Sequence, residues 1–151
     1  MGNNSNETVT RGQRFLVNGN NTVTDQLTGL VIIQDPRKLG LPFTKKMTFF
    51  EAEEACKELD FAGYKDWRLP TREELVATTD CTRRVPCYNT DIFQGDFLGW
   101  YWTGEEGAKD LLFAWCLAAG SGDLWCHRKS ESNYVRPVRS NRHSMESWFV
   151  K

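Results

Sequence analysis

The sequence has no apolar run long enough to cross a membrane. Its purest apolar stretch, Leu30 to Ile33, is far shorter than the roughly 20 residues of a membrane-spanning helix. Residues 1–10 have neither the basic start nor the apolar centre of a signal peptide. We therefore expect no membrane insertion. The protein is then either cytosolic or exported by a signal or upstream region that this sequence does not contain.

The chain also lacks an excess of charge of either sign. It carries 19 Lys and Arg against 20 Asp and Glu, a formal net charge of -1, which does not favour binding to nucleic acid by bulk charge. With 40% hydrophobic residues in 151, the composition is that of one folded domain. We expect this domain over residues 13–140, after a polar tail or linker at 1–12 and before a C-terminal extension at 141–151.

Signatures of catalysis and metal binding are missing as well. There is no nucleophile elbow, P-loop, GxGxxG or HExxH motif. The two histidines are His127 and His143, and no C-x-x-C pair accompanies them, so a zinc site is not predicted. His127 follows Cys126, but neighbouring residues of a strand point to opposite faces. We expect no catalytic residue, no cofactor and no metal.

The hydrophobic patterns predict an α+β domain. One helix begins after Thr48, which forms a T-x-x-E capping box with Glu51, and is expected to stop at Gly63; a second begins after Thr71 and ends near Asp80. Short apolar segments between Gly- and Asn-rich turns predict strands at 15–17, 22–25, 30–34, 101–103, 111–117, 124–127 and 133–138.

The first turn offers a second interpretation. Its oxygen-bearing side chains, Asn18, Asn20, Thr22 and Asp25, could imitate a calcium-binding loop. Only one of the four is a carboxylate, and Asn and Gly are the residues that tight turns favour. A plain hairpin turn is therefore the preferred interpretation.

Five cysteines raise the question of disulfides. Cys116 and Cys126 flank the turn A-A-G-S-G-D and are symmetric about residue 121, so we predict that they face each other across a hairpin and form a disulfide. Cys81 and Cys87 bracket a short irregular loop that a second disulfide would close. Two disulfides would place the protein outside the cytosol, whereas five reduced thiols would place it inside.

Four segments, in this order, resemble one known family. They are R-F-x-x-N-G-N-N-T-V-T-D-x-L-T-G-L at 14–30, A-G-Y-K-D-W-R-L-P-T-R-E-E-L at 62–75, Y-W-T-G at 101–104 and N-Y-V-R-P-V-R at 133–139. The set resembles the family typified by the C-terminal domain of the Legionella collagen-like adhesin, within the C-type-lectin-like and formylglycine-generating-enzyme-like fold group. The resemblance implies a C-type-lectin-like fold with two helices packed on a small, mostly antiparallel sheet. It also implies adjacent terminal strands and a loop-rich half that binds ligand.

The resemblance also bears on cysteine chemistry. Relatives often pair a helix cysteine with a cysteine in the last strand, in a V-R-C-V-R motif, but this chain has Pro137 there. We therefore expect Cys56, on the apolar face of the first helix, to be a buried free thiol. The fold group includes an oxidase with a reactive cysteine pair, and Cys116 and Cys126 do not match its spacing. The calcium-dependent sugar motifs of C-type lectins are absent too.

The arginines of the family-like motifs have a structural and a functional interpretation. Arg68 lies between apolar residues and is expected to pair with Asp66, with Glu74 or with backbone carbonyls. Arg136 and Arg139 lie in the predicted last strand. Because such arginines more often anchor a fold than contact a ligand, we favour the structural interpretation.

The segment W-C-H-R-K-S-E-S-N at 125–133 is the predicted ligand surface. Trp125 would be an aromatic anchor, the basic residues would contact sulfated or carboxylated sugars, and a tryptophan next to Gly99 would join them; the alternative is a solvated hairpin edge. The predicted ligand-binding residues are Trp100, Trp125, His127, Arg128, Lys129 and Asn133.

The chain ends in an apolar cluster, Trp148, Phe149 and Val150, which is expected to dock on a neighbouring chain in a homo-oligomer. The sequence therefore predicts a non-catalytic binding module, extracellular or displayed on a cell surface like an adhesin, that recognises glycans or a protein receptor. The alternative is a structural or assembly subunit of a surface, filament or virion complex.

Overall fold

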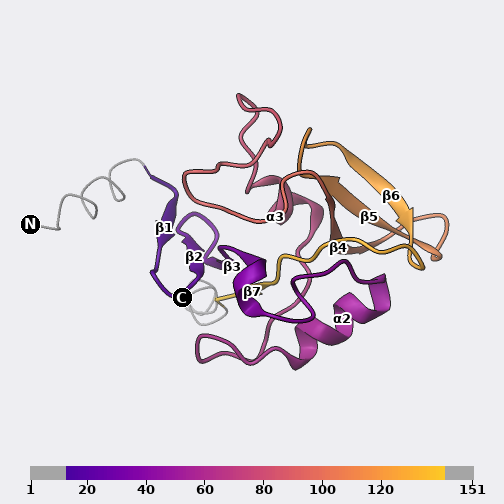
Figure 1. Ribbon diagram of the computed structural model, residues 1–151, viewed down its shortest axis with the longest axis horizontal. Coiled ribbons are helices and arrows are strands. Elements are labelled where there is room, and N and C mark those ends of the chain that lie inside the picture. Colours follow the sequence, from indigo (N-terminus) through magenta and orange to yellow (C-terminus); the bar gives the residue numbers. More distant parts are fainter. Residues whose placement is uncertain (1–12, 142–151) are drawn as a thin grey trace, which may run out of the picture.

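The computed structural model describes residues 13–141, which form two antiparallel sheets and two helices (Figure 1). The first sheet has the order β1-β2-β3-β7, and the second has the order β4-β5-β6. The class is α+β, as predicted, but the strands divide into two sheets where one was expected. The strands are β1 (Phe15–Val17), β2 (Thr22–Asp25), β3 (Leu30–Ile33), β4 (Trp100–Glu106), β5 (Phe113–Ala118), β6 (Leu124–Arg128) and β7 (Val138–Ser140).

The first sheet joins the two ends of the described chain. The strand β3 lies between β2 and β7, and all four of its residues are buried. A strand that is covered on both faces is typically apolar throughout, as in the run Leu-Val-Ile-Ile. The last strand, β7, pairs with β3 in the register Leu30↔Ser140 and Ile32↔Val138. Terminal strands therefore lie together, as the resemblance implied.

The first helix, α2 (Phe49–Glu58), begins where the sequence predicts. The Glu51 N–H donates to Thr48 Oγ1 at 3.3 Å, and the Thr48 N–H donates to Glu51 Oε1 at 2.9 Å, which completes the capping box. The predicted stop at Gly63 is wrong, because the backbone of Leu59 is already extended. Gly63 has a positive φ of 87° and serves instead the turn that bridges Phe61 and Tyr64.

The second helix, α3 (Arg72–Val76), also begins at a capping box, between Thr71 and Glu74. It ends at Val76, with Ala77 as its C-cap, earlier than the expected end near Asp80. The Thr78 and Thr79 hydroxyls donate to the carbonyls of Leu75 and Val76, so side chains satisfy acceptors that a further turn of helix would otherwise use.

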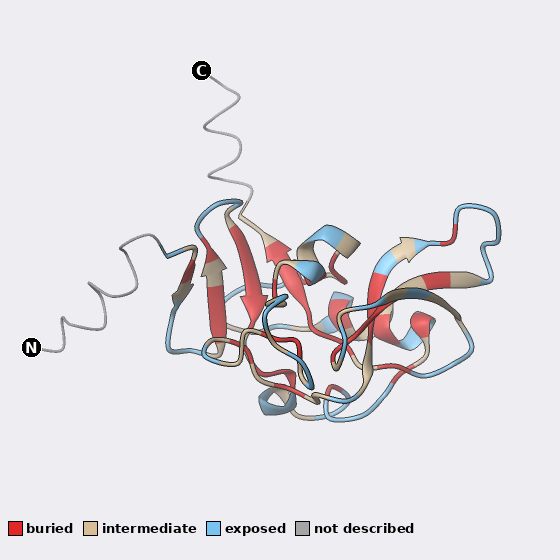
Figure 2. Ribbon diagram, turned by 90° about the horizontal axis from the view of Figure 1, so that it is seen from above, coloured by how far each residue is buried: buried red, intermediate tan, exposed pale blue. Residues whose placement is uncertain are grey.

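The core lies between the sheets and the helices (Figure 2). On one side, α2 packs against the three-stranded sheet, with Phe49 edge-on to the fully buried Trp102 at 5.4 Å between ring centroids. On the other side, Trp67 fills the space beside Val31 and Ile33, and its indole N–H donates to the carbonyls of residues 61 and 64. Trp67 therefore packs the segment 59–62 against β3.

The later strands depart from their predicted limits. The 133–138 segment is not a continuous strand: Asn133 and Tyr134 make single bridges to Met47 and Tyr101 before β7 begins. This segment therefore connects the second sheet to the first. A short 3-10 helix, η1 (Pro36–Leu39), follows β3. Within residues 13–141, no helix is long and apolar enough to span a membrane.

The β5–β6 hairpin forms at the predicted turn, but its register differs by one residue from the predicted one. Cys116 pairs with Trp125, and Cys126 pairs with Trp115. Because a one-residue shift moves every side chain to the other face, the two cysteines point away from each other. The predicted Cys116–Cys126 disulfide is therefore not formed.

The other cysteine predictions have mixed outcomes. All five cysteines lie within the described residues, and all are free thiols, so the predicted disulfide between Cys81 and Cys87 is also not formed. Cys81 is exposed on the surface loop, whereas Cys87 is buried with its sulfur facing the Ala118 carbonyl. Cys56 is a buried free thiol, as expected.

Candidate functional site

Three of the predicted ligand residues lie on one face of the three-stranded sheet. In the β4-β5-β6 register, Trp100 is opposite Ala118, Trp125 is opposite Cys116 and His127 is opposite Ala114. Ala114, Cys116 and Ala118 alternate along β5, so they share one face with their partners. We call Trp100, Trp125 and His127 the aromatic face.

The aromatic face has a stacked part and an open part. The His127 ring lies 4.6 Å from the Trp100 ring between centroids, and the His127 side chain is 16% exposed. Trp125 is 66% exposed. Small side chains along β5 leave room for rings from the two outer strands to approach each other, so the sequence pattern Ala-x-Cys-x-Ala shapes this surface.

The two tryptophans of β4 differ in burial. Trp102 is fully buried, and its indole N–H donates to the Met47 carbonyl at 2.7 Å. Trp100 is half-buried and packs against the hydrophobic core cluster that contains Trp102 and Phe49. Glu131 is a neighbour that the sequence analysis missed: its carboxylate lies 3.6 Å from His127 Nδ1, and the i, i+4 spacing was the available signal.

The remaining predicted residues, Arg128, Lys129 and Asn133, are engaged in other contacts. Arg128 points to the opposite face, where its guanidinium lies over the Phe113 ring at 5.2 Å. Lys129 forms an ion pair with Glu106 and lies over the Phe49 ring at 4.9 Å. Asn133 is 5% exposed and donates to the Cys116 sulfur at 3.6 Å.

These placements correct the predicted ligand surface. Lys129 already has a carboxylate and a ring as partners, and Asn133 is a buried structural contact. The basic residues at 127–129 alternate between faces, so they do not form one cationic patch. The predicted recognition of sulfated or carboxylated sugars by a basic triplet therefore loses its geometric support.

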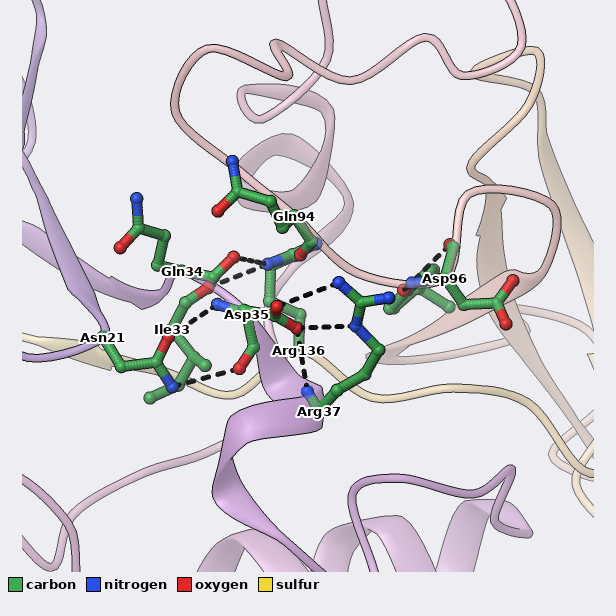
Figure 3. A network of polar contacts seen from close by, with 9 residues as sticks. Asn21, Ile33, Gln34, Asp35, Arg37, Gln94, Asp96 and Arg136 are labelled. Atoms are coloured by element: carbon green, nitrogen blue, oxygen red, sulfur yellow. Dashed lines mark hydrogen bonds and ion pairs between the residues drawn. The ribbon is translucent and has the colours of Figure 1, made fainter.

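Arg136 holds the centre of the molecule together (Figure 3). It is fully buried and donates to the carbonyls of Ile33 at 2.9 Å, Gln34 at 2.8 Å and Gln94 at 2.8 Å. The rings of residues 88, 93 and 101 surround the guanidinium, with their centroids between 4.9 and 5.6 Å from it. Its role is structural, because it ties three chain segments and contacts no open surface.

A second polar contact lies beside it (Figure 3). Asp35 accepts from the backbone and side chain of Arg37, both at 3.0 Å, and its own N–H donates to Asn21 Oδ1 at 2.9 Å. Burial opposes ionisation of Asp35, but the hydrogen bonds from Arg37 outweigh it and hold the pKa of Asp35 below its usual value. This contact joins the first turn to the start of η1.

The other motif arginines also make structural pairs. Arg68 pairs with Glu74 through two contacts of 2.8 and 2.9 Å, which was one of its predicted partners. Asp66 pairs instead with Arg139, at 2.6 Å, and the Arg139 guanidinium lies 3.7 Å from the centre of the Tyr64 ring. The structural interpretation of the family-like motifs is the one that these contacts support.

Four of the five thiols lie in surroundings that suppress their ionisation. Burial raises the pKa of Cys56 to about 12, and burial raises the pKa of Cys116, Cys87 and Cys126 as well. Among residues 13–141, no group of three or more His, Cys, Asp and Glu side chains is placed to hold a metal ion.

The first turn is a hairpin turn between β1 and β2. Asn18 Nδ2 donates to the hydroxyls of Thr22 and Thr24, and the Thr22 hydroxyl donates to Asn20 Oδ1. Asp25 points to Arg14, with contacts of 2.7 and 2.8 Å. The oxygen atoms are therefore used within the hairpin, as the preferred interpretation states.

Two terminal predictions fall outside the described part of the chain. They are the tail at 1–12 and the apolar cluster Trp148, Phe149 and Val150 within the C-terminal extension.

Comparison with known proteins gives one result. The sequence model of the Lcl C-terminal domain matches residues 21–139, which is most of the chain and nearly all of the described part. No curated protein matches the chain.

Proposed function

Because the chain belongs to the Lcl C-terminal domain family, we propose that it is a non-catalytic binding module displayed on a cell surface or outside the cell. The family name points to an adhesin-related surface module. Its adhesive contact would be made by the aromatic face, and its ligand would be a glycan.

The exposure of Trp125 carries this proposal. A side chain of this size, 66% exposed on a regular strand, leaves a large apolar ring in water. Its neighbours on the same face are another indole, Trp100, and the imidazole of His127. Indole rings pack against the apolar faces of sugar rings, while the imidazole and the Glu131 carboxylate are hydrogen-bonding groups for hydroxyls.

The arrangement favours neutral glycans over anionic ones. Two carboxylates lie near the aromatic face: Glu131 beside His127, and Glu106 opposite Ala114. Glu106 pairs with Lys129, which is therefore not free to bind an anionic group. A protein receptor is the other ligand class for such a surface, because exposed tryptophans are also the usual anchors of protein interfaces.

The test is glycan-array binding by the full chain and two matched variants. Trp125→Ala removes the exposed ring, and we expect about a tenfold or greater loss of binding. Leu27→Ala is the control: Leu27 is 73% exposed but lies in the β2–β3 turn of the other sheet, and its removal should change nothing. Glycan binding that is unchanged in Trp125→Ala would refute the aromatic face as the binding site. Binding to protein receptors without any binding to glycans would show that the ligand is a protein.

The finer fold assignment belongs to the same proposal. We infer a C-type-lectin-like fold, supported by the pairing of β7 with β3, the two helices and the long irregular segment between α3 and β4. Superposition of an experimental structure on C-type-lectin-like domains tests it, and a different strand order in the four-stranded sheet would refute it.

A further inference from the structure

A groove of about 610 Å³ lies along α2, and no residue of the aromatic face lines it. One wall is the segment 41–47, and the other is one side of the helix. Its floor is apolar: Phe43 and Met47 are each 3% exposed, and Ala55 and Leu59 are half-buried. The volume falls within the range of pockets that hold ligands in proteins.

The helix wall of the groove is acidic. Glu51, Glu54 and Glu58 follow one another at i, i+3 and i+7 on α2, which places them along one side of the helix. Glu58 has no ion-pair partner among residues 13–141, and Glu54 has only Lys57 at 3.8 Å. Asp60 continues the row past the end of the helix, and the Lys65 ammonium lies 4.0 Å from its carboxylate.

The opposite wall carries less charge. Lys45 and Lys46 line it, and the Lys46 ammonium lies over the Tyr134 ring at 5.7 Å. Four carboxylates therefore face two ammonium groups across an apolar floor. Leu41, which is 70% exposed, adds apolar surface to the rim.

We propose that this groove docks a short segment of a partner protein that carries apolar anchor side chains flanked by Lys or Arg. The apolar floor would bury the anchors, and the row of carboxylates along α2 would attract the flanking basic groups, with Glu58, which has no ion-pair partner among residues 13–141, as the first to pair. From Glu51 to Glu58 the helix rises about 10 Å, the length of about three residues of extended chain. In an extended segment, alternate side chains point to the floor while their neighbours reach the rims.

The probes are three synthetic peptides that differ only in pattern. The first is acetyl-Gly-Lys-Leu-Lys-Phe-Lys-Gly-amide; the second has Glu in place of each Lys, and the third has Ser in place of Leu and Phe. Fluorescence anisotropy with the full chain should give a Kd below about 1 mM for the first peptide and binding about tenfold or more weaker for the other two. Amide chemical shifts should change along α2, at residues 51–60.

Matched variants assign the binding to the groove. Glu58→Lys should weaken binding of the cationic peptide about tenfold, whereas Glu73→Lys, the same charge reversal on the exposed surface of α3, should not. Leu41→Ser should weaken binding, whereas Leu27→Ser, at similar exposure in the other sheet, should not. Glu58 is the last residue of α2, where a lysine is compatible with the helix dipole, so the variant is expected to fold.

Several results would overturn the proposal. They are equal binding of the three peptides, equal binding by Glu58→Lys and Glu73→Lys, or shift changes confined to another surface. Self-association of the chain that Glu58→Lys abolishes would show instead that a second copy occupies the groove. The outcome is independent of the glycan proposal, because Trp125→Ala should leave peptide binding unchanged.

Discussion

Replacing Arg136 by Met tests the view that one buried cation joins the two halves of the molecule. Methionine keeps most of the aliphatic stem but removes the guanidinium, which takes away the donor of the Ile33 and Gln94 carbonyls. The Gln34 carbonyl loses one donor but still accepts from the Gln94 N–H at 3.0 Å. An unsatisfied buried acceptor costs roughly 1–3 kcal/mol. The carbonyls of Ile33 and Gln94 together therefore cost roughly 2–6 kcal/mol before the offsetting gains are counted.

Two effects reduce that cost. The Arg136 Nε has no hydrogen-bond partner, and Met removes the penalty of burying a charge that no carboxylate contacts directly within the described residues. Water can also reach part of the site once the loop around Gln94 loosens. We therefore expect a loss of about 3 kcal/mol in the free energy of unfolding, a large part of the 5–15 kcal/mol of an ordinary domain.

Urea unfolding measures this loss as a lower midpoint at an unchanged m-value. Arg84→Met is the control, because Arg84 is exposed and its replacement should change stability by less than about 0.5 kcal/mol. The free energy of unfolding of Arg136→Lys should lie between those of Arg136→Met and the wild type, since one ammonium cannot reproduce the planar arrangement of guanidinium donors. A loss below about 1 kcal/mol for Arg136→Met would refute the reasoning.

Three further predictions concern the same architecture. Gly95→Ala should destabilise the fold by about 1–3 kcal/mol in the same assay, because a Cβ there would lie 2.9 Å from the Arg136 guanidinium, whereas equal midpoints would contradict this packing. Burial opposes ionisation of Asp25 and Glu74, but hydrogen bonds from their arginine partners outweigh it and lower both pKa values. Stability contributed by these ion pairs should be present above the ordinary carboxyl pKa and be lost as pH falls below about 4; a flat profile of urea midpoints from pH 6 to about pH 3 would contradict it. Brief alkylation followed by mass spectrometry should label Cys81 first in the native protein, and all five cysteines should react after unfolding without reductant; fewer than five labelled thiols would contradict the free state of the cysteines.

The local signals in the sequence were reliable where a few neighbouring residues decide the structure. Both capping boxes start helices at the predicted residues, Thr48 and Thr71. The first three strands lie at their predicted places, because Asn and Gly turns delimit them. Helix ends were less predictable: at α2, the chain leaves the helix so that Leu59 and Phe61 can pack beside Trp67.

The candidate site was only partly predictable for a related reason. The β5–β6 hairpin is centred between residues 120 and 121, whereas the predicted pairing of Cys116 with Cys126 requires a centre at residue 121. This small difference shifts the strand register by one residue and so decides which side chains share a face. Long-range contacts decided the rest, since Asn133 meets Cys116 and Lys129 meets Phe49 only after the sheet and α2 have packed. The groove along α2 was not predicted, because its two walls meet only through tertiary packing.

The segment 133–138 has a mechanical consequence. Chain connections at residues 13 and 141 load the four-stranded sheet, whereas a ligand on Trp125 would pull on the three-stranded sheet. Tension between an anchor and a bound ligand would therefore pass through the segment 133–138, which connects the two sheets (Figure 1). Backbone hydrogen bonds join Tyr134 of this segment to Trp100 and Trp102 of β4. The Arg136 side chain joins it to Ile33 at the end of β3. The strength of attachment under flow would then be limited by this crossing as well as by the ligand contact itself.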